Sequence, residues 1–284
     1  MSSYSKSPDN LVIPVRNLKF RLEPGPSDAE RWWHGGDPVP TAFFNALSST
    51  FPDGERFFMD SVRRFQGLAS EPLKSQIKSF IGQEAVHSRE HLEFNAFAAK
   101  GGYNIAALER RAKRALASHE KRSDVRKLAA TCALEHFTAI LAHALLSADS
   151  ADLAGAPEEA RRLWSWHAVE ELEHKAVAYD TFLLATKGWS RTRRYLVRVA
   201  AMMISTWVVM RVIGANMASL YRQDGINTPK TWWRTLKYLL VAPGALRRIM
   251  VPYARYYRPG FHPWDHDDRD LLAKTHARYD LSTG

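Results

Sequence analysis

The chain has 284 residues, of which 45% are hydrophobic, so it belongs among globular proteins long enough to bury a sizeable core. Its one cysteine, Cys132, excludes an internal disulfide and a cysteine-based zinc site, and it favours a reducing compartment. The first residues, MSSYSKSPDN, contain no apolar stretch behind a basic one, so we expect no secretory signal and a cytoplasmic location.

The formal net charge of +10 is concentrated in one part of the chain. Between Lys187 and Arg258 there are 14 lysines and arginines against a single acid, Asp224, which leaves the rest of the chain slightly acidic. A segment of this kind usually meets lipid headgroups, nucleic acid or an acidic partner. A solvated basic surface without a partner is the alternative.

The predicted elements begin with an irregular arm over residues 1–37. Its stretch LVIPVRNLKFRLEPGP alternates apolar and polar residues, and its prolines oppose a helix. From Pro38 onward the pattern is helical almost throughout. The predicted helices cover Pro40 to Ser49, residues 50–65, Glu71 to Lys100, Asn104 to His119, Ser123 to Ser147, Pro157 to Lys187, Arg191 to Tyr221 and Pro229 to Met250, with a short last helix in the tail.

The segment WHAVEELEHKAVAYD, residues 166–180, combines titratable and apolar residues on one predicted helix. Each residue of an α-helix advances by about 100° around the axis. His167, Glu171 and His174 therefore lie within roughly 60° of one another. Glu170 lies close to this stripe, whereas Glu173 turns away from it. The segment thus predicts a helix face that carries two imidazoles and a carboxylate.

The helix predicted over residues 71–100 carries a related motif in FIGQEAVHSREH. Glu84 and His87 form Glu-x-x-His, and His91 falls on the same face. Glu55 and Glu135 stand in apolar surroundings on two further helices. The order along the chain is therefore Glu, Glu-x-x-His, Glu, Glu-x-x-His, on four separate helices.

Four carboxylates that converge in an apolar interior require positive charge between them, because an isolated buried carboxylate costs several kcal/mol or more. Two divalent cations supply that charge, and imidazoles add neutral nitrogen ligands. This is the ligand set of ferritin-like di-iron and di-manganese bundles. Iron is favoured as the metal, with manganese and zinc as alternatives. The predicted ligands are Glu55, Glu84, His87, Glu135, His167, Glu171 and His174.

The spacing of these residues predicts an all-α, ferritin-like four-helix bundle. Glu55 and Glu84 lie on helices joined by a short loop, as an antiparallel pair requires, and residues 101–122 provide a long crossover to the helix of Glu135. Residues 38–188 would form the bundle, and residues 189–284 would be basic, aromatic-rich helices packed on it within one domain. Surface ion pairs are the alternative, but the neighbours of Glu135 could hardly be a solvated face.

Three residues are expected to take part in catalysis. Glu84 and Glu171 would bridge the two metals. His91 would lie beside the ligands or face the substrate, with direct ligation of a metal as the alternative. His167 is interpreted as a seventh ligand, although it could instead hydrogen-bond to a ligand carboxylate.

Several other polar residues are interpreted more simply. His136 and His143 are expected to be satisfied packing histidines, and Asp180 could orient a ligand imidazole. The stretch FHPWDHDD contains His262, Asp265, His266 and Asp267. It could bind a further metal, but we favour an ordered loop in which Asp267 caps the last helix.

At these positions the chain resembles two groups of proteins. The core, with Glu55, Glu84-x-x-His87, Glu135 and His167-x3-Glu171-x2-His174, resembles the ferritin-like di-iron N-oxygenases that act on p-aminobenzoate. Over nearly its whole length the chain resembles a bacterial family of predicted metal-dependent hydrolases, in the stretches IPVRNLKF, QEAVHSREH, HAVEELEHKAVAYD and RPGFHPWDHDD. The resemblance implies a dimetal site with Glu55, Glu84, His87, Glu135, Glu171 and His174 as its core ligands.

The basic C-terminal third is also rich in aromatic residues. Its longest uncharged run, Val199 to Met210, has 12 residues, whereas a bilayer span needs about 20, so a transmembrane helix is disfavoured. A helix buried against the bundle and a monotopic membrane contact remain open. The flanking stretches mix Trp and Tyr with Arg and Lys, which suits an anionic membrane interface. Nucleic acid is disfavoured, because no nucleic-acid-binding motif is present.

These features lead to three functional hypotheses. The first is an O2-activating di-iron oxygenase that oxidises an apolar organic or lipid-like substrate and needs an electron donor. The second is a metal-dependent hydrolase of an ester, amide or phosphate. The third is a non-enzymatic metal-binding protein associated with a membrane. We favour the oxygenase, placed in the cytoplasm or at the inner face of the membrane, and leave homodimerisation open.

Overall fold

The computed structural model describes residues 6–8, 11–22, 31–118, 121–147 and 151–279. Within these ranges the regular structure is entirely helical, which confirms the predicted all-α helical bundle. Residues 1–5, 9, 10 and 23–30 of the predicted arm, and the predicted helix end at His119, lie outside the described residues.

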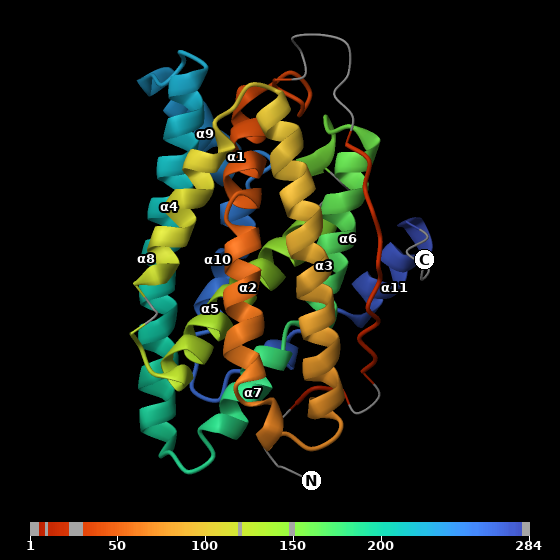
Figure 1. Ribbon diagram of the computed structural model, residues 1–284, viewed down its shortest axis with the longest axis vertical. Helices are drawn as coiled ribbons and strands as arrows, with labels where there is room; N and C mark the ends of the chain where they lie inside the picture. The colour runs from red at the N-terminus through yellow and green to blue at the C-terminus, as the bar shows by residue number, and fades with distance from the viewer. Residues whose placement is uncertain (1–5, 9–10, 23–30, 119–120, 148–150, 280–284) are drawn as a thin grey trace.

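Four helices form the core of the bundle (Figure 1). They are α2 (Phe51–Arg63), α3 (Leu73–Lys100), α5 (Asp124–Ser147) and α6 (Glu158–His174). The two most extensive helix contacts join α2 to α3 and α5 to α6, and α2 also packs on α5. Helix α4 (Ile105–Ala117) lies in the connection from α3 to α5, as the predicted crossover requires.

The remaining helices surround this core. They are α1 (Pro38–Ser48), α7 (Val177–Ala185), α8 (Arg191–Gln223), α9 (Pro229–Leu240), α10 (Ala245–Arg255) and α11 (Arg269–Tyr279), with 3-10 turns η2 (Gln66–Leu68), η3 (Ala151–Leu153) and η4 (Pro263–Asp265). The long helix α8 packs on α1, α4 and α5, and α10 packs on α5 and α9. Helices α8, α9 and α10 therefore cover one side of the bundle, whereas α11 packs on α6 and α5 at another side (Figure 1).

The single helix predicted from Pro157 to Lys187 is wrong, because the structure divides it into α6 and α7. The break follows His174, whose imidazole points into the bundle. The next residue, Lys175, turns the other way and its Nζ donates to Asp268 near the C-terminus. Neither proline nor glycine marks this point in the sequence, and the partner is 93 residues away.

The single helix predicted from Pro229 to Met250 is also wrong, since α9 ends at Leu240 and α10 begins at Ala245. Pro243 and Gly244 lie in the connection, and Gly244 has φ +77°. A Cβ at Gly244 would lie 2.8 Å from the carbonyl oxygen of Val241. This turn therefore requires glycine, and the Pro-Gly pair was a local signal for it.

Residues 11–22 of the arm lie along α3 and α6 without forming regular structure (Figure 1). The backbone N–H of Phe20 donates to Glu90 Oε2 of α3 over 2.9 Å, and Arg89 of α3 donates back to the carbonyl of Leu18. The arm is therefore held by side chains of α3 in place of a strand partner.

Among the described residues, two helices are long and apolar enough to cross a membrane, α5 and α8. The apolar window of α5 is 72% buried inside the protein, as expected of a core helix, whereas that of α8 is only 22% buried. Helix α8 nevertheless packs along three other helices, so this match is weak evidence for a span.

Candidate metal centre

The seven predicted metal ligands meet in the interior of the four-helix core. Helix α2 contributes Glu55, α3 contributes Glu84 and His87, α5 contributes Glu135, and α6 contributes His167, Glu171 and His174. None of these seven residues is more than 4% exposed. The spacing of one helical turn between the ligands of α3, and between those of α6, places each group on one face of its helix. That they bind metal stays a prediction.

One half of the cluster surrounds the imidazole of His174. Its Nε2 lies 3.2 Å from Glu84 Oε1, 3.5 Å from Glu135 Oε2 and 3.6 Å from Glu171 Oε2. Candidate ligand atoms of Glu84, Glu135 and His174 all lie within 4.8 Å of one another, a spacing at which one ion could contact all three.

The other half surrounds the imidazoles of His87 and His167. His87 Nδ1 lies 3.7 Å from Glu84 Oε1 and 3.8 Å from Glu171 Oε1. His167 Nε2 lies 3.0 Å from the same oxygen of Glu171. Candidate ligand atoms of Glu55, Glu84 and His87 form a further group within 4.8 Å. Glu84 and Glu171 therefore lie between the two halves and face both.

The atoms that face the centre of this cluster have no hydrogen-bond partner in the protein. They are both carboxylate oxygens of Glu55, Glu84 and Glu135, one oxygen of Glu171, Nδ1 of His87, and Nε2 of His167 and His174. Buried polar atoms are normally paired, and so many unpaired ones in one place need a ligand to account for them. The donor set of carboxylate oxygens and imidazole nitrogens fits a pair of divalent cations.

The opposite ring nitrogens of two of these histidines are held by hydrogen bonds. His87 Nε2 lies 3.0 Å from Glu170 Oε2, which can only accept, so His87 carries its proton there and its Nδ1 lone pair faces the cluster. His174 Nδ1 lies 2.8 Å from Gln83 Oε1. The amide nitrogen of Gln83 donates to Glu173, which leaves its oxygen to accept from His174. The Nε2 lone pair of His174 then faces the cluster.

A longer chain of hydrogen bonds orients His167. Asn95 donates through Nδ2 to Glu109 and accepts at Oδ1 from the Ser48 hydroxyl. The Ser48 oxygen is then left to accept from Nδ1 of His91, so Nε2 of His91 accepts from Nδ1 of His167. The Nε2 lone pair of His167 therefore points to the cluster, as a ligand requires.

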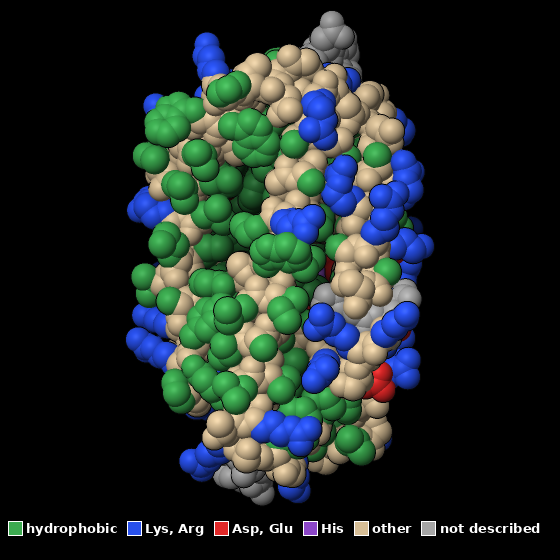
Figure 2. Space-filling view, turned by 90° about the vertical axis from the view of Figure 1, so that its left-hand side faces the viewer, with side chains coloured by type: hydrophobic (Ala, Val, Ile, Leu, Met, Phe, Trp, Pro, Cys, Tyr) green, Lys and Arg blue, Asp and Glu red, His purple; other side chains and the backbone are tan. Residues whose placement is uncertain are grey.

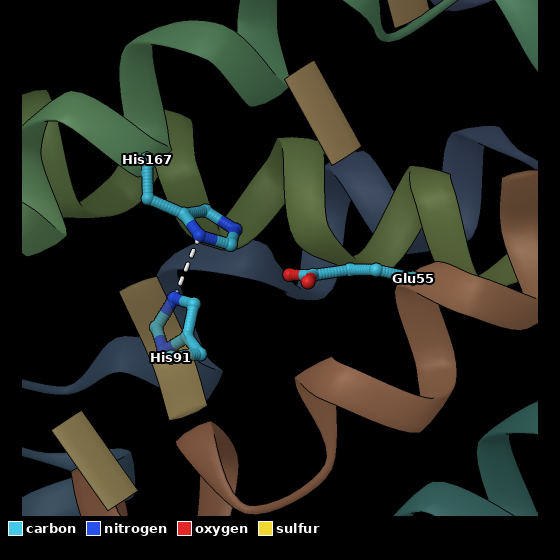
Figure 3. Close-up of side chains that lie close together, drawn as sticks. All are labelled: Glu55, His91 and His167. Atoms are coloured by element: carbon cyan, nitrogen blue, oxygen red, sulfur yellow. Dashed lines mark hydrogen bonds between the residues drawn. The ribbon is translucent and has the colours of Figure 1, made fainter. Parts of the chain in front are cut away.

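Figure 3 shows how the two histidines lie beside Glu55. His91 and His167 come from α3 and α6 and are joined by their hydrogen bond of 2.8 Å, and the carboxylate of Glu55 points toward the same space. Both ring nitrogens of His91 are occupied, by Ser48 and by His167. His91 therefore supports His167, and its position agrees with the prediction that it lies beside the ligands.

The local electrostatics agree with a need for cations. Burial raises the pKa of Glu55 and of Glu135 well above the usual range, and neighbouring carboxylates raise it further. Burial opposes protonation of His87, but its contacts with Glu170 and Glu84 raise its pKa well above 6.5. Without a bound cation, the cluster therefore takes up protons, which would compete with a metal for the same atoms.

Burial lowers the pKa of His91 well below 6.5 and that of His167 to about 4, and nearby imidazoles lower both further. Both rings are therefore neutral at pH 7, as the hydrogen-bond chain through Ser48 requires.

Sequence reasoning missed the contribution of the N-terminal arm. Arg16, in the arm, donates to Glu170 over 3.0 Å and to Glu173 over 2.8 and 2.7 Å, and all three side chains are buried. These two carboxylates are the ones that hold His87 directly and His174 through Gln83. The signal was present in the basic residue of IPVRNLKF and in the two acids that lie outside the His167 stripe on the same helix, but the sequence did not show that they pair.

Other predicted site residues lie elsewhere. The prediction that Asp180 orients a ligand imidazole is wrong, because its Oδ1 lies 3.0 Å from Nε2 of His262. Asp267 accepts from the backbone N–H of Arg269, the first residue of α11, but Asp268 occupies the N-cap position itself. His136 lies 3.2 Å from the Pro252 carbonyl.

The further metal site that FHPWDHDD could have formed, as the alternative to an ordered loop, is only partly assembled. His266 groups with His143 and Asp268, not with His262, Asp265 or Asp267. Lys175 already pairs with Asp268, and Asp268 also lies 2.7 Å from Nδ1 of His143, which therefore has a partner. The local positive charge leaves this group little need for a metal.

An apolar cavity of about 60 Å³ reaches the cluster. Phe51, Leu141 and Trp164 line it, together with His167 and Glu171. These two are the members of the cluster that a small molecule in the cavity would meet first. The apolar walls would exclude bulk water from the reacting atoms.

Comparison with known proteins gives one match. A family model described as "Predicted metal-dependent hydrolase" covers residues 14–267, which is most of the chain. Neither the curated proteins nor the solved structures contain a match. The matched region includes all seven predicted ligands and Arg16.

This finding corrects the functional prediction made from the sequence. The family model indicates a hydrolase, so the assignment to an oxygen-activating oxidoreductase is wrong. The physical reason is that carboxylates and imidazoles at these spacings specify metal binding, and the same ligand types serve hydrolytic and oxidative centres. Metal dependence itself is supported by the family description and by the clusters described above.

Proposed function

The chain belongs to the family of predicted metal-dependent hydrolases, and from this premise we propose that it hydrolyses an ester, amide or phosphate bond at a centre for two divalent cations. One observation supports this most directly. Carboxylate oxygens of Glu55, Glu84 and Glu135 and one nitrogen each of His87, His167 and His174 are buried, face one space and have no hydrogen-bond partner.

The geometry suggests how the ligands would be divided. Glu135 and His174 would hold one cation, and Glu55, His87 and His167 the other. Glu84 and Glu171, which face both halves, would be shared. Zinc, manganese and iron all suit carboxylate and imidazole ligands, and metal analysis of the purified protein decides among them.

Divalent cations at such a centre polarise a carbonyl or phosphoryl oxygen and lower the pKa of a water molecule. The protein would contribute orientation and a dry pocket. His91 would keep the neutral His167 ring turned toward the centre, and Glu170 would do the same for His87. Phe51 and Trp164 would form apolar walls beside the reacting bond.

The test is metal analysis of protein purified without chelators, combined with a hydrolysis screen of esters, amides and phosphates. We expect about two divalent ions per chain and turnover that a chelator removes and added metal restores. Glu135→Ala should lose at least one ion and the turnover. Glu93→Ala, an exposed carboxylate on α3, is the matched control and should keep both. Hydrolysis that persists in Glu135→Ala would contradict the proposal.

A further inference from the structure

Large hydrophobic side chains gather on the side of the molecule where α8 lies (Figure 2). On α8 they recur at intervals of seven and four residues, which makes one stripe along the helix. We call this surface the α8–α10 face and define it by Leu196, Met203, Trp207, Trp233, Met250 and Val251, all exposed. Trp207 and Trp233 are each 60% exposed. Exposing such large apolar side chains to water is unfavourable, and patches of this kind usually mark a binding surface.

The charged residues on the helices of this face are mostly basic, although Arg234 of α9 pairs with the partly exposed Asp37 and Arg248 of α10 pairs with Asp152. The single acid between Lys187 and Arg258 is Asp224, whose side chain is 1% exposed and pairs with Arg31 over 2.6 Å. Exposed cations lie next to the exposed rings: the guanidinium of Arg211 lies 4.4 Å from the ring centre of Trp207, and Lys237 lies 5.7 Å from that of Trp233. Figure 2 shows lysines and arginines at the edges of the hydrophobic surface.

Aromatic rings beside cations on an apolar surface are the features of a monotopic contact with an anionic bilayer. A nucleic acid would meet the cations but not the apolar side chains between them. A spanning helix is disfavoured too, because α8 packs on α1, α4 and α5 and its charged residues interrupt the apolar stripe. The helix would therefore lie in the plane of the membrane surface.

An apolar cavity of about 140 Å³ opens beneath this face, between α8 and α10. Val209 and Met210 of α8 and Ile249 of α10 are among the residues that line it, and Met210 is 42% exposed, so the cavity reaches the surface. Its inner wall includes Phe51 and Leu141, which also line the smaller cavity beside His167 and Glu171. The two cavities therefore adjoin each other across shared side chains, and we call the pair, which extends from the α8–α10 face to the candidate metal centre, the apolar path.

We propose that the α8–α10 face docks on an anionic membrane and that this path takes the acyl chain of a single-chain ester, with the ester group at the inner end. The substrate rests on the proposed hydrolase function; the docking does not. The inner cavity of about 60 Å³ has room for about two water molecules, so the alcohol part of the ester is small. Phosphate groups are disfavoured because the path is apolar.

The reaction at the inner end is ordinary ester hydrolysis. The oxygen of a water molecule bonds to the acyl carbon, and the bond from that carbon to the alcohol oxygen breaks. One water proton ends on the departing alcohol, and the other stays with the new carboxylic acid. Neither an oxidant nor a reductant is consumed.

Docking is tested by sedimentation of the full-length protein with vesicles of phosphatidylcholine alone or mixed with phosphatidylglycerol. We expect binding to the mixed vesicles that high salt weakens, and a loss of about tenfold or more in Trp207→Asp and in Trp233→Asp. The control is Leu68→Asp, an equally exposed apolar residue outside the face, which should bind as the parent does. Absence of binding to either vesicle, or equal loss in Leu68→Asp, overturns the docking proposal. A dimer that Trp207→Asp separates would also overturn it, because a second copy would then cover the face.

The cavity is tested first without catalysis, by binding of the fluorescent fatty acid cis-parinaric acid to metal-free protein. Val209→Trp fills the outer cavity and should weaken binding about tenfold or more. Leu92→Trp, on the exposed side of α3, should leave it unchanged. Equal binding by Val209→Trp and the parent protein overturns the chain-binding proposal.

The metal-loaded protein is then offered methyl esters of increasing acyl length. We expect kcat/KM to rise with chain length in the parent and to lose that dependence in Val209→Trp. Fatty-acid binding without any ester hydrolysis would overturn the substrate assignment but would leave the proposal that the cavity binds an acyl chain. It would count against the hydrolase function only if the screen of amides and phosphates also showed no turnover.

Discussion

Nε2 of His91 lies 2.8 Å from Nδ1 of His167, and this contact ties the candidate metal centre to a chain of polar groups that ends at Glu109. Because a carboxylate only accepts, each hydrogen bond along the chain has one direction. The last free lone pair is Nε2 of His167, which faces Glu171 over 3.0 Å. A residue on α4 thus determines which nitrogen of a histidine on α6 is available to a metal.

Replacing Ser48 by alanine should weaken metal binding about 10- to 100-fold. Without the Ser48 hydroxyl, His91 loses the acceptor for its Nδ1 proton, and it no longer selects one tautomer of His167. Zinc affinity, measured by competition with a chromophoric chelator, checks this. The control is Ser88→Ala, a buried serine of the same helix as His91 whose hydroxyl donates to Pro52. Equal affinities in both variants would show that the chain has no such role.

Replacing Arg16 by methionine should destabilise the protein by about 3–5 kcal/mol, because it leaves Glu170 and Glu173 buried without their cation. Urea denaturation of the metal-free proteins measures this change. Arg63→Met, which breaks an exposed pair with Asp60, should change stability by about 0.5 kcal/mol or less. If Arg16→Met and Arg63→Met lower the free energy of unfolding by the same small amount, the pairing of Arg16 with Glu170 and Glu173 does not stabilise the site.

The metal-free protein should lose stability as the pH rises from about 7 to about 8.5. Burial raises the pKa of Glu55 and Glu135, and contacts with Glu170 and Glu84 raise that of His87 against the effect of burial. Above pH 6.5 the folded protein holds protons on these groups that the unfolded chain has already released. A rise in pH disfavours the state that binds more protons, so the free energy of unfolding falls.

His91 and His167 do not alter this sign. Their pKa values are lowered by burial, so both rings are neutral in the folded chain, and in the unfolded chain each holds at most about a quarter of a proton in this range. Urea midpoints with and without saturating zinc provide the measurement, and zinc should remove most of the pH dependence by replacing the protons. A metal-free midpoint that rises with pH would contradict the predicted charge state of the cluster.

Cys132 should report on unfolding of the bundle. Burial raises the pKa of its thiol, and its Sγ contacts the Ala178 carbonyl at 3.2 Å in the core beneath α7. We expect Ellman's reagent to react with the native protein more slowly than with the urea-unfolded protein, by on the order of 100-fold or more. Rapid labelling of the native protein would mean that α5 and α7 separate readily.

Much of the site could be predicted because helical periodicity is a local property. The spacings of Glu84 with His87, and of His167 with Glu171 and His174, place each set on one helix face whatever the rest of the chain does. Glu135 could be included because its neighbours on the same helix are apolar or small. The structure brings all of these side chains into one buried cluster, as expected.

Other features depend on residues that are distant in the sequence. The break after His174 accompanies the contact between Lys175 and Asp268, and the roles of Glu170 and Glu173 depend on Arg16, more than 150 positions away. The chemistry was misjudged for a different reason: the ligand types are shared by oxidative and hydrolytic centres, and only the family relationship distinguished them.

The sequence by itself determined the all-α class, the four helices that carry the carboxylates and the residues that face the centre, because each follows from the 100° step of a helix and from the cost of burying charge. Only the tertiary structure decided which nitrogen of each imidazole is free, how Arg16 neutralises the surrounding acids, and where an apolar path reaches the surface. Each of these is a contact between segments far apart in the chain, and local pattern carries no record of which distant segments will meet.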